Sequence, residues 1–308
     1  MIRCTEEMRI EVKNTRFALT GATGFLGGHV LSFLKDANAD TVMICRSGTE
    51  ASKGEPKKNI IKYKYDELEK SEVVDDLKGR TLIHCAWFSV GQPTNLEHLT
   101  HHLPFQIDLV ARLARIGFSQ LVLVGSCFEF GLRYGPQAPE SIVAPITPYA
   151  VAKVALSQYL RSLYWSQGDY VRSNAKFKWV RLFYFFGPNQ HPNAIIPQLE
   201  RVLSAGSIEF KMSLGEQLLD YLPVEQVAEL LVASSTSFFE SGVLHIGRGE
   251  PIALRRFVES YIRNRSQPAQ INLQLGAYRY RKEDSIALWS SKPGISFASW
   301  EDMATSIK

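Results

Sequence analysis

Two residues four positions apart, Tyr149 and Lys153, could carry out proton-transfer chemistry. On a helix such residues share a face, so the ammonium group would lie near the phenol. A nearby positive charge favours the phenolate and lowers the pKa of the phenol, which makes it a usable acid or base near neutral pH. Ser126 follows a strongly apolar run, and its hydroxyl could hydrogen-bond a substrate carbonyl. The three residues indicate acid–base chemistry; a packed tyrosine, a solvated lysine and a serine at a strand end would give the same spacing.

Residues 20–28 form a second motif, T-G-A-T-G-F-L-G-G. The apolar run 15–19 precedes it, and a segment with helical apolar spacing follows. Strand, glycine turn and helix are the context of a dinucleotide-binding fingerprint. Gly21 would let the chain leave the strand sharply, Gly24 would admit a pyrophosphate close to the backbone, and Gly27 would let the helix pack tightly. We predict nucleotide binding here; the alternative is a plain tight turn.

The segments that must position these residues alternate between strand and helix. Apolar strands are predicted at 41–45, 80–86, 120–126 and 178–183, and helices at 71–78, 103–116 and 149–164. This rhythm predicts an α/β fold with a parallel sheet covered by helices on both faces. Because ligands bind beyond the carboxyl ends of such strands, we expect the loops after Cys45, Ala86, Val124 and Phe186 to line one crevice.

Composition limits the class of protein. The chain has 308 residues, of which 45% are hydrophobic and 21% charged, as in ordinary globular proteins. The net charge of +4 is spread along the chain, so we predict no nucleic-acid partner. The four cysteines include no C-x-x-C pair and the histidines form no ligand-spaced set, which predicts no metal site and a reducing, cytoplasmic location. No apolar run is long enough to span a bilayer, and the first residues lack the apolar stretch of a signal peptide, so we predict no membrane partner.

Together, the motifs resemble the extended short-chain dehydrogenase/reductase family, in its nucleotide-sugar epimerase/dehydratase group, over nearly the whole chain. Besides T-G-x-x-G-x-x-G and Y-x-x-x-K, residues 125–131 match S-S-x-x-x-Y-G and residues 181–188 match R-x-x-N-x-Y-G-P. Residues 215–221 match G-x-Q-x-R-D-Y, and residues 245–249 match N-I-G-x-G. The resemblance implies a Rossmann-type doubly wound parallel sheet with a smaller C-terminal substrate-binding lobe.

We expect the dinucleotide-binding domain at 1–186 plus about 221–249, and the substrate-binding lobe at 187–220 and 250–308. The resemblance also implies a homodimer, in which the helices at about 97–116 and 149–165 pair with their copies.

The resemblance further implies a bound nicotinamide dinucleotide, a sugar nucleotide in the second lobe, and hydride transfer at a ring carbon. Tyr149 would exchange the proton of the sugar hydroxyl, Lys153 would tune it and hold the nicotinamide ribose, and Ser126 would hydrogen-bond the reacting oxygen. The other cofactor contacts that the resemblance implies are Gly21, Thr23, Gly24, Phe25 and Leu26 at the pyrophosphate, Asp66 near the adenine, and Cys85, Ala86 and Trp87 beneath the cofactor.

The choice between NADP(H) and NAD(H) depends on the end of the second strand. There Arg46, followed by Ser47, stands where NAD-preferring members carry an acidic residue. A guanidinium suits a 2′-phosphate by its charge and its forked donors. We therefore expect NADP(H), with a surface role for Arg46 as the alternative.

Departures from the family pattern narrow the activity. The 4,6-dehydratases follow the serine with Asp-Glu, the acid and base that eliminate water, and here those places hold Cys127 and Phe128. A phenylalanine cannot move a proton, so dehydration is not expected, nor is an epimerisation that needs a cysteine at the place of Phe128. Cys127 would be either a packing residue or a polar contact.

The nucleotide subsite also departs from the pattern. Leu219 and Tyr184 replace an arginine and an asparagine that contact phosphate in the family, while Arg281 could still clamp a diphosphate. The expected substrate contacts are Cys127, Phe128, Tyr184, Asn189, Gln190, Ile195, Gln198, Gln217 and Arg281.

Our leading hypothesis is an NADPH-dependent reductase of the 4-keto group of a nucleotide-linked deoxysugar. The alternative enzyme is an NAD-retaining nucleotide-sugar 4-epimerase. A third hypothesis is a non-catalytic dinucleotide-sensing regulator, whose usual sign is loss of the tyrosine or the lysine; both are present here.

Overall fold

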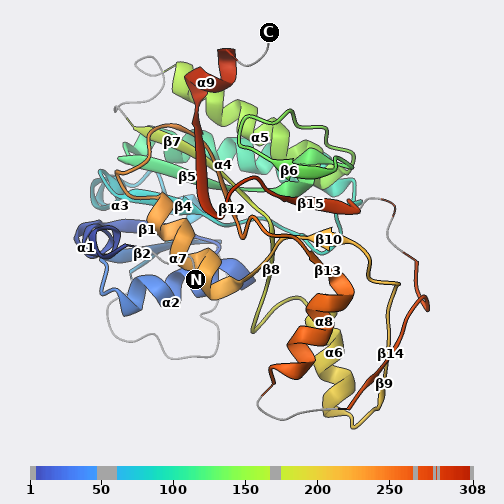
Figure 1. Cartoon of the computed structure of the whole chain (residues 1–308). Coiled ribbons are helices and arrows are strands. Elements are labelled where there is room, and N and C mark those ends of the chain that lie inside the picture. The colour runs from blue at the N-terminus through green and yellow to red at the C-terminus, as the bar shows by residue number, and fades with distance from the viewer. Residues whose placement is uncertain are drawn as a thin grey trace.

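A computed structural model describes residues 5–46, 61–166, 175–265, 270–279, 282 and 285–305. The large sheet has eight strands, with helices on both faces, and a smaller lobe lies beside it (Figure 1). In spatial order the strands are β16 (Gly294–Ser299), β12 (Gly242–Gly247), β7 (Lys176–Leu182), β5 (Gln120–Ser126), β4 (Thr81–His84), β1 (Phe17–Thr20), β2 (Thr41–Cys45) and β3 (Lys62–Lys64). The predicted α/β class and parallel sheet are therefore confirmed.

The strand order reverses between β1 and β4. From β1 the chain proceeds outward to β2 and β3, and then returns to β4, β5, β7 and β12 on the other side. All these strands pair in parallel, so their carboxyl ends lie at one edge of the sheet. In open α/β sheets the ligand crevice lies at such a reversal. The loops that follow β1 and β4 meet at this point.

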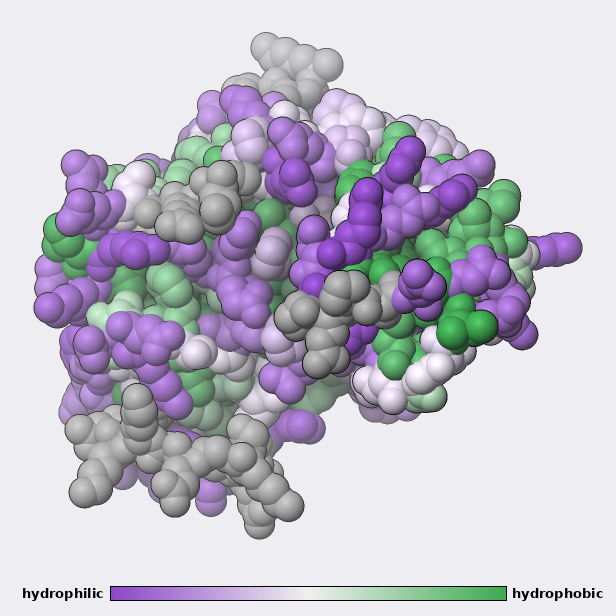
Figure 2. Space-filling view, turned by 60° about the horizontal axis from the view of Figure 1, so that its bottom comes forward, coloured by the Kyte–Doolittle hydropathy of each residue, from purple (hydrophilic) through white to green (hydrophobic). Residues whose placement is uncertain are grey.

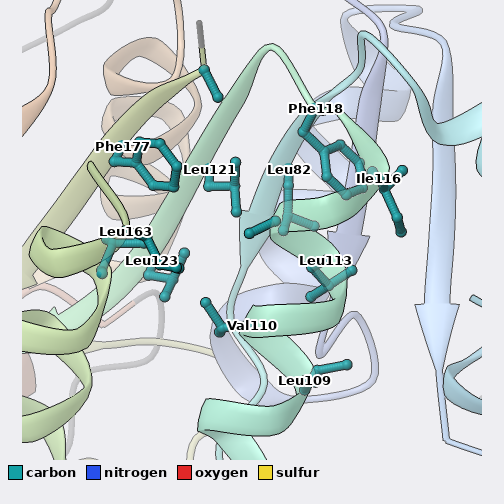
Figure 3. Packing of buried hydrophobic residues seen from close by; sticks show 14 of the residues in the cluster. Leu82, Leu109, Val110, Leu113, Ile116, Phe118, Leu121, Leu123, Leu163 and Phe177 are labelled. Carbon is teal, nitrogen blue, oxygen red and sulfur yellow. The ribbon is translucent and has the colours of Figure 1, made fainter. Parts of the chain in front are cut away.

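Each face of the sheet is buried by its own set of helices. One cluster joins the sheet to α3 (Ser71–Leu77), α4 (Leu103–Ile116) and α5 (Pro148–Trp165). Figure 3 shows part of it, with the side chains of Leu109, Val110 and Leu113 facing the sheet. The other cluster joins the opposite face to α1 (Glu6–Asn14), α2 (Phe25–Asp36) and α7 (Val224–Ser234). The two cores hold the edge that carries the glycine turn rigid.

The smaller lobe is built from short elements. Its own hydrophobic cluster lies between α6 (Ile195–Ser204) and α8 (Leu254–Arg263). In the described part of the chain, three small sheets lie outside the large one: β13 (Ile252–Ala253), β10 (Leu218–Leu219), β15 (Ala287–Ser290) and β6 (Gly135–Gln137); β11 (Tyr221–Pro223) and β8 (Tyr184–Phe186); and β14 (Asn272–Gln274) and β9 (Glu209–Lys211). Of these strands, β6 lies beside α5, next to the large sheet (Figure 1). Figure 2 shows hydrophilic and hydrophobic residues interspersed over the face that includes this lobe.

The end of the described chain differs from the sequence expectation. We assigned 250–308 wholly to the lobe, but β16 pairs antiparallel with β12 at the edge of the large sheet. The helix that follows, α9 (Trp300–Thr305), places Trp300 in the cluster on the α4 and α5 side. The buried positions of β16 are Gly294, Ser296 and Ala298, whereas the larger Ile295 and Phe297 lie on its more exposed face. The hydrophobic pattern of this segment therefore does not indicate how it packs.

Candidate active site

The glycine turn after β1 is shaped by close backbone contacts. Gly21 has φ +72°, and a Cβ added there would lie 2.6 Å from the nitrogen of Ala86. A Cβ on Gly27 would lie 2.1 Å from the carbonyl oxygen of Gly21. Gly24, by contrast, is exposed at the N-cap of α2, and its added Cβ would meet only that same oxygen, at 3.3 Å. The turn therefore leaves accessible backbone at a helix N-terminus, which fits a pyrophosphate.

The segment after β4 lies against this turn. The ring of His84 links Thr20 of β1 to Gln106 of α4, and the Gln106 amide donates to the Ala86 carbonyl at 2.9 Å. Cys85, Ala86 and Trp87 are all half-buried. The expected cofactor segment therefore runs beside the glycine turn at the strand-order reversal.

The remaining residues expected at the cofactor are more spread out. Thr23 is exposed, Leu26 is half-buried, and Phe25 stacks on Phe185 with ring centres 5.5 Å apart. Arg46 is exposed at the end of β2, and its guanidinium carbon lies 4.5 Å above the centre of the Phe88 ring. Asp66 is exposed in a turn of 3-10 helix after β3. Ser47 lies outside the described residues.

Ser126, Tyr149 and Lys153 come together at the carboxyl end of β5. Thr147 caps α5 by accepting a hydrogen bond from the nitrogen of Ala150, so Tyr149 lies in the first helical turn. The Lys153 Nζ lies 5.8 Å from the centre of the Tyr149 ring and donates to the carbonyl oxygen of Val124 at 2.8 Å. The Ser126 hydroxyl hydrogen-bonds the Tyr149 phenol. The three side chains can thus act on a single bound group.

The electrostatics of this cluster differ from the sequence expectation. We expected Lys153 to lower the pKa of Tyr149, but burial raises the pKa of the phenol well above its usual value, opposed by its hydrogen bond to Ser126. Burial also lowers the pKa of Lys153 to about 7, from 10.5. Both shifts follow from desolvation, which favours the neutral form of each group. In the chain alone, Tyr149 is therefore a protonated acid at neutral pH.

Aromatic rings surround the phenol. The ring of Trp87 lies 5.9 Å from that of Tyr149, His98 lies 5.3 Å away, and Phe128 lies 6.2 Å away, all edge-on. The Phe128 ring also contacts Tyr184 at 6.2 Å. Sequence reasoning missed His98, because it lies in the π-helical turn His98–His102 before α4, with no motif to mark it. The proton-donating group is thus enclosed largely by apolar rings.

A buried ionic network lies beneath Ser126, and sequence reasoning missed it as well. The Glu129 carboxylate, fully buried, accepts hydrogen bonds from the nitrogen of Ser126 at 2.9 Å and from Nε1 of Trp179 at 3.0 Å. Its other oxygen lies 2.6 Å from Nε of Arg181. The spacing Ser-x-x-Glu is the signature of a capping box, and this signal could have revealed the contact to Ser126.

The residues expected at the substrate are not all brought together. Cys127 is buried in a cluster with Phe130, Phe183 and Leu288, which favours its packing role. Phe128 and Tyr184 lie near Tyr149. The other residues are Asn189, exposed; Gln190, which donates to the Phe185 carbonyl; Ile195, half-buried; Gln198, which donates to the Asn193 carbonyl; and Gln217, buried. Arg281 lies outside the described residues.

Two clefts open beside the lobe. One, of about 470 Å³, is lined by Asn189, Gln190 and Pro223 among others, and the other, of about 790 Å³, by Arg248 and Phe257 among others. They share Phe186, Glu200 and Tyr261 as lining residues. Neither is lined by Ser126, Tyr149 or Lys153, so they are separate from the acid–base cluster.

Within the described ranges, no group of three or more His, Cys, Asp or Glu side chains could hold a metal ion. Nor does any helix in that part of the chain have the length and apolar character needed to cross a membrane.

A reversing parallel sheet with a glycine turn at the reversal defines a Rossmann-type nucleotide-binding α/β protein. The chain belongs to the NAD dependent epimerase/dehydratase family, whose model matches residues 17–247.

Individual relatives are distant in sequence. The chain is 23% identical over 282 residues to a dTDP-6-deoxy-L-talose 4-dehydrogenase (NAD(+)) of Aggregatibacter actinomycetemcomitans, a match that covers 89% of this chain and 98% of the relative. Among solved structures, a UDP-N-acetylglucosamine 4-epimerase from Methanobrevibacter ruminantium M1, in complex with UDP-N-acetylmuramic acid, superposes with a TM-score of 0.73 at 20% identity, covering 90% of this chain and 89% of that one. The dTDP-glucose 4,6-dehydratase DesIV from Streptomyces venezuelae gives 0.67 at 16% identity, covering 91% and 88%. The structural likenesses show the shared fold.

Proposed function

We propose that this protein reduces the 4-keto group of a nucleotide-linked deoxysugar with NADPH, using Tyr149 as the general acid. The observation that carries the proposal is the contact among Ser126, Tyr149 and Lys153 at the carboxyl end of β5, beside the glycine turn. Burial keeps the phenol protonated, which is the form that reduction of a carbonyl needs.

Each residue of the site would have its own role in the reaction. Gly21, Gly24 and the first turn of α2 would hold the pyrophosphate, and NADPH would supply the hydride. The Ser126 hydroxyl would hold the keto oxygen, and the Tyr149 O–H would deliver its proton to that oxygen. One hydride and one proton convert the ketone to an alcohol and leave NADP⁺. Lys153 would hold the nicotinamide ribose beside them.

Phe128 supports reduction over dehydration. Its ring lies edge-on to Tyr149, at the position where the 4,6-dehydratases carry a carboxylate. Elimination of water needs a base and an acid besides the tyrosine. Neither Cys127 nor Phe128 is suited to these roles, because the Cys127 thiol is buried and the Phe128 ring has no ionisable group.

The relative from Aggregatibacter supports the substrate class. Its name describes oxidation at carbon 4 of a nucleotide-linked 6-deoxysugar, which is the reverse of a 4-keto reduction. Full-length coverage of that relative extends the likeness to the lobe as well as the sheet.

The proposed preference for NADPH depends on Arg46. Arg46 directly follows β2, where Rossmann-type proteins carry the side chain that contacts the adenosine ribose, and its guanidinium carbon lies 4.5 Å from the centre of the Phe88 ring. The relative's name specifies NAD(+), so cofactor preference must be measured. We expect Arg46→Ala to lower kcat/KM for NADPH by about tenfold or more and to change that for NADH little, as loss of a charged hydrogen bond predicts. Equal losses with both cofactors would contradict the role of Arg46.

The decisive experiment follows NADPH absorbance with a panel of dTDP-, GDP- and UDP-linked 4-keto-6-deoxysugars. We expect stoichiometric NADPH oxidation with at least one of them and loss of activity in Tyr149→Phe. Protein that keeps NAD through desalting and interconverts sugar epimers without added NADPH would instead establish the 4-epimerase. If Tyr149→Phe left the cellular phenotype intact while a Gly24 substitution abolished it, the protein would be a dinucleotide sensor.

A further inference from the structure

We propose that Trp87 is a positioning residue for Lys153: its indole face holds the ammonium group beside Tyr149, and His98 locks the indole in place. The inference deepens the proposed function, since Lys153 is the residue that would hold the nicotinamide ribose. It concerns a contact that the Y-x-x-x-K motif does not contain.

The geometry around the ammonium group is specific. The Lys153 Nζ lies 4.0 Å from the centre of the Trp87 ring, inside the range of a cation–π contact. The Tyr149 and Trp179 rings are farther away, at 5.8 and 5.9 Å. The hydrogen bond to the Val124 carbonyl uses one of the three N–H donors. A second donor can point at the indole face, and the third is left for a bound group.

His98 fixes the orientation of the indole. The Trp87 Nε1 donates to Nδ1 of His98 at 3.1 Å, and the two rings stack at 6.3 Å. The other ring nitrogen of His98 lies 3.0 Å from the carbonyl oxygen of Gln92. Since a carbonyl can only accept, Nε2 carries the hydrogen and Nδ1 accepts from Trp87. Nδ1 of His102 also lies 3.2 Å from this nitrogen. His98 is fully buried at the start of the π-helical turn His98–His102, and its hydrogen bonds hold the ring in place.

The loop between β4 and α4 is also tied to the tyrosine. The nitrogen of Tyr149 donates to the carbonyl oxygen of Pro93 at 3.1 Å, and the His98 ring touches the Tyr149 ring. The loop between β4 and α4 therefore carries both the indole and the backbone anchor for α5. Lys153 and Tyr149 are positioned by one unit of structure.

The contact with the Trp87 indole influences whether Lys153 is charged. Burial lowers the pKa of its ammonium group to about 7, so modest stabilisation decides whether it is charged at physiological pH. The titratable groups that interact with it from the surrounding elements are Glu129 beneath Ser126, Cys85 and His84 at the end of β4, and His98. The Glu129 carboxylate, paired with Arg181, favours the charged form of Lys153 from a distance, whereas the Val124 carbonyl at 2.8 Å and the Trp87 indole at 4.0 Å contact the ammonium group directly.

The test titrates Lys153 by NMR in full-length protein carrying [ε-¹³C]lysine, with the signal assigned by Lys153→Met. We expect Trp87→Leu to lower the pKa of Lys153 by about one unit, the size of a desolvated cation–π contact. Trp87→Phe keeps an aromatic face and should lower it less. His98→Asn, whose side-chain oxygen can replace Nδ1 as the acceptor, should stay near the wild type, whereas His98→Leu should resemble Trp87→Leu.

The measurement uses resting protein, without cofactor or sugar, so it does not depend on the identity of the substrate. Failure of the whole 4-keto sugar panel would reject the proposed function and leave this inference standing. A Lys153 titration that is the same in Trp87→Leu, Trp87→Phe and wild type would overturn the inference. If Trp87→Leu does not fold, Trp87→Phe and the two His98 variants decide the matter, since equal titrations in His98→Leu and His98→Asn also refute it.

Discussion

Replacing Glu129 by glutamine should destabilise the protein strongly, although the side chain keeps its shape. The carboxylate is fully buried and 2.6 Å from Nε of Arg181, whose own side chain is 4% exposed. Glutamine removes the negative charge and leaves the guanidinium buried without a counter-charge. Breaking one partner of a buried pair costs about 3–5 kcal/mol. For a chain of this size, that corresponds to a fall in Tm of about 5–8 °C.

The assay is urea unfolding followed by circular dichroism, with the Glu250→Gln variant as the control. Glu250 also pairs with an arginine, Arg248, but both side chains are largely exposed, so its loss should change the free energy of unfolding by less than about 1 kcal/mol. The double variant Glu129→Met with Arg181→Leu removes both charges and should recover part of the loss. A Glu129→Gln protein as stable as the control would refute the reasoning.

Two further outcomes follow from the structure, and a third, dimerisation, from the family resemblance. Gly27→Ala should weaken NADPH binding and lower the free energy of unfolding by about 1–3 kcal/mol, because its Cβ would lie 2.1 Å from a carbonyl oxygen. Gly28→Ala should bind NADPH normally, because its Cβ would lie 3.6 Å from its nearest neighbour. Equal binding of NADPH by the two variants would contradict this. Burial lowers the pKa of Lys153 and of Lys178 to about 7, so the folded chain binds fewer protons than the unfolded chain above that pH. The free energy of unfolding should therefore rise from pH 7 to about 8.5, by up to about 1.4 kcal/mol per pH unit for each lysine, and Lys178→Met should flatten that rise in urea titrations. Light scattering should find a dimer that pairs α4 and α5 with their copies; a strict monomer would exclude it.

Much of the fold could be predicted because its signals are local. The strand at 120–126 and the helix at 103–116 match β5 and α4 residue for residue, since continuous apolar runs and a glycine C-cap mark them. The reversal of strand order could be anticipated from the glycine turn. The return of β16 to the large sheet could not, because two short candidate strands near the C-terminus look alike in sequence and only tertiary pairing separates them.

The candidate site was predictable where a motif encodes it along the chain. The spacing of Tyr149 and Lys153 places both on one face of α5, and the structure has them there. The contacts of His98 with Trp87 and of Glu129 with Arg181 depend on which segments meet in space, and a single sequence carries little sign of that; only the contact of Glu129 with Ser126 has a local signal. The expectation that the pKa of Tyr149 is lowered was wrong for a related reason. The spacing shows that a charged residue is near, but it says nothing about how deeply the pair is buried.

Burial of the tyrosine–lysine pair also bears on the direction of the reaction. A phenol whose pKa is raised by burial donates a proton readily only to a group that becomes more basic during the reaction, such as a ketone oxygen accepting a hydride. To act as a base, the same phenol must first lose its proton, and a positive charge on Lys153 would favour that loss. Because the pKa of Lys153 lies near 7, raising the pH removes that charge over the range in which a base would be needed. We therefore expect the rate of alcohol oxidation to depend on whether cofactor binding raises the pKa of Lys153, which a titration of Lys153 with and without bound cofactor would measure.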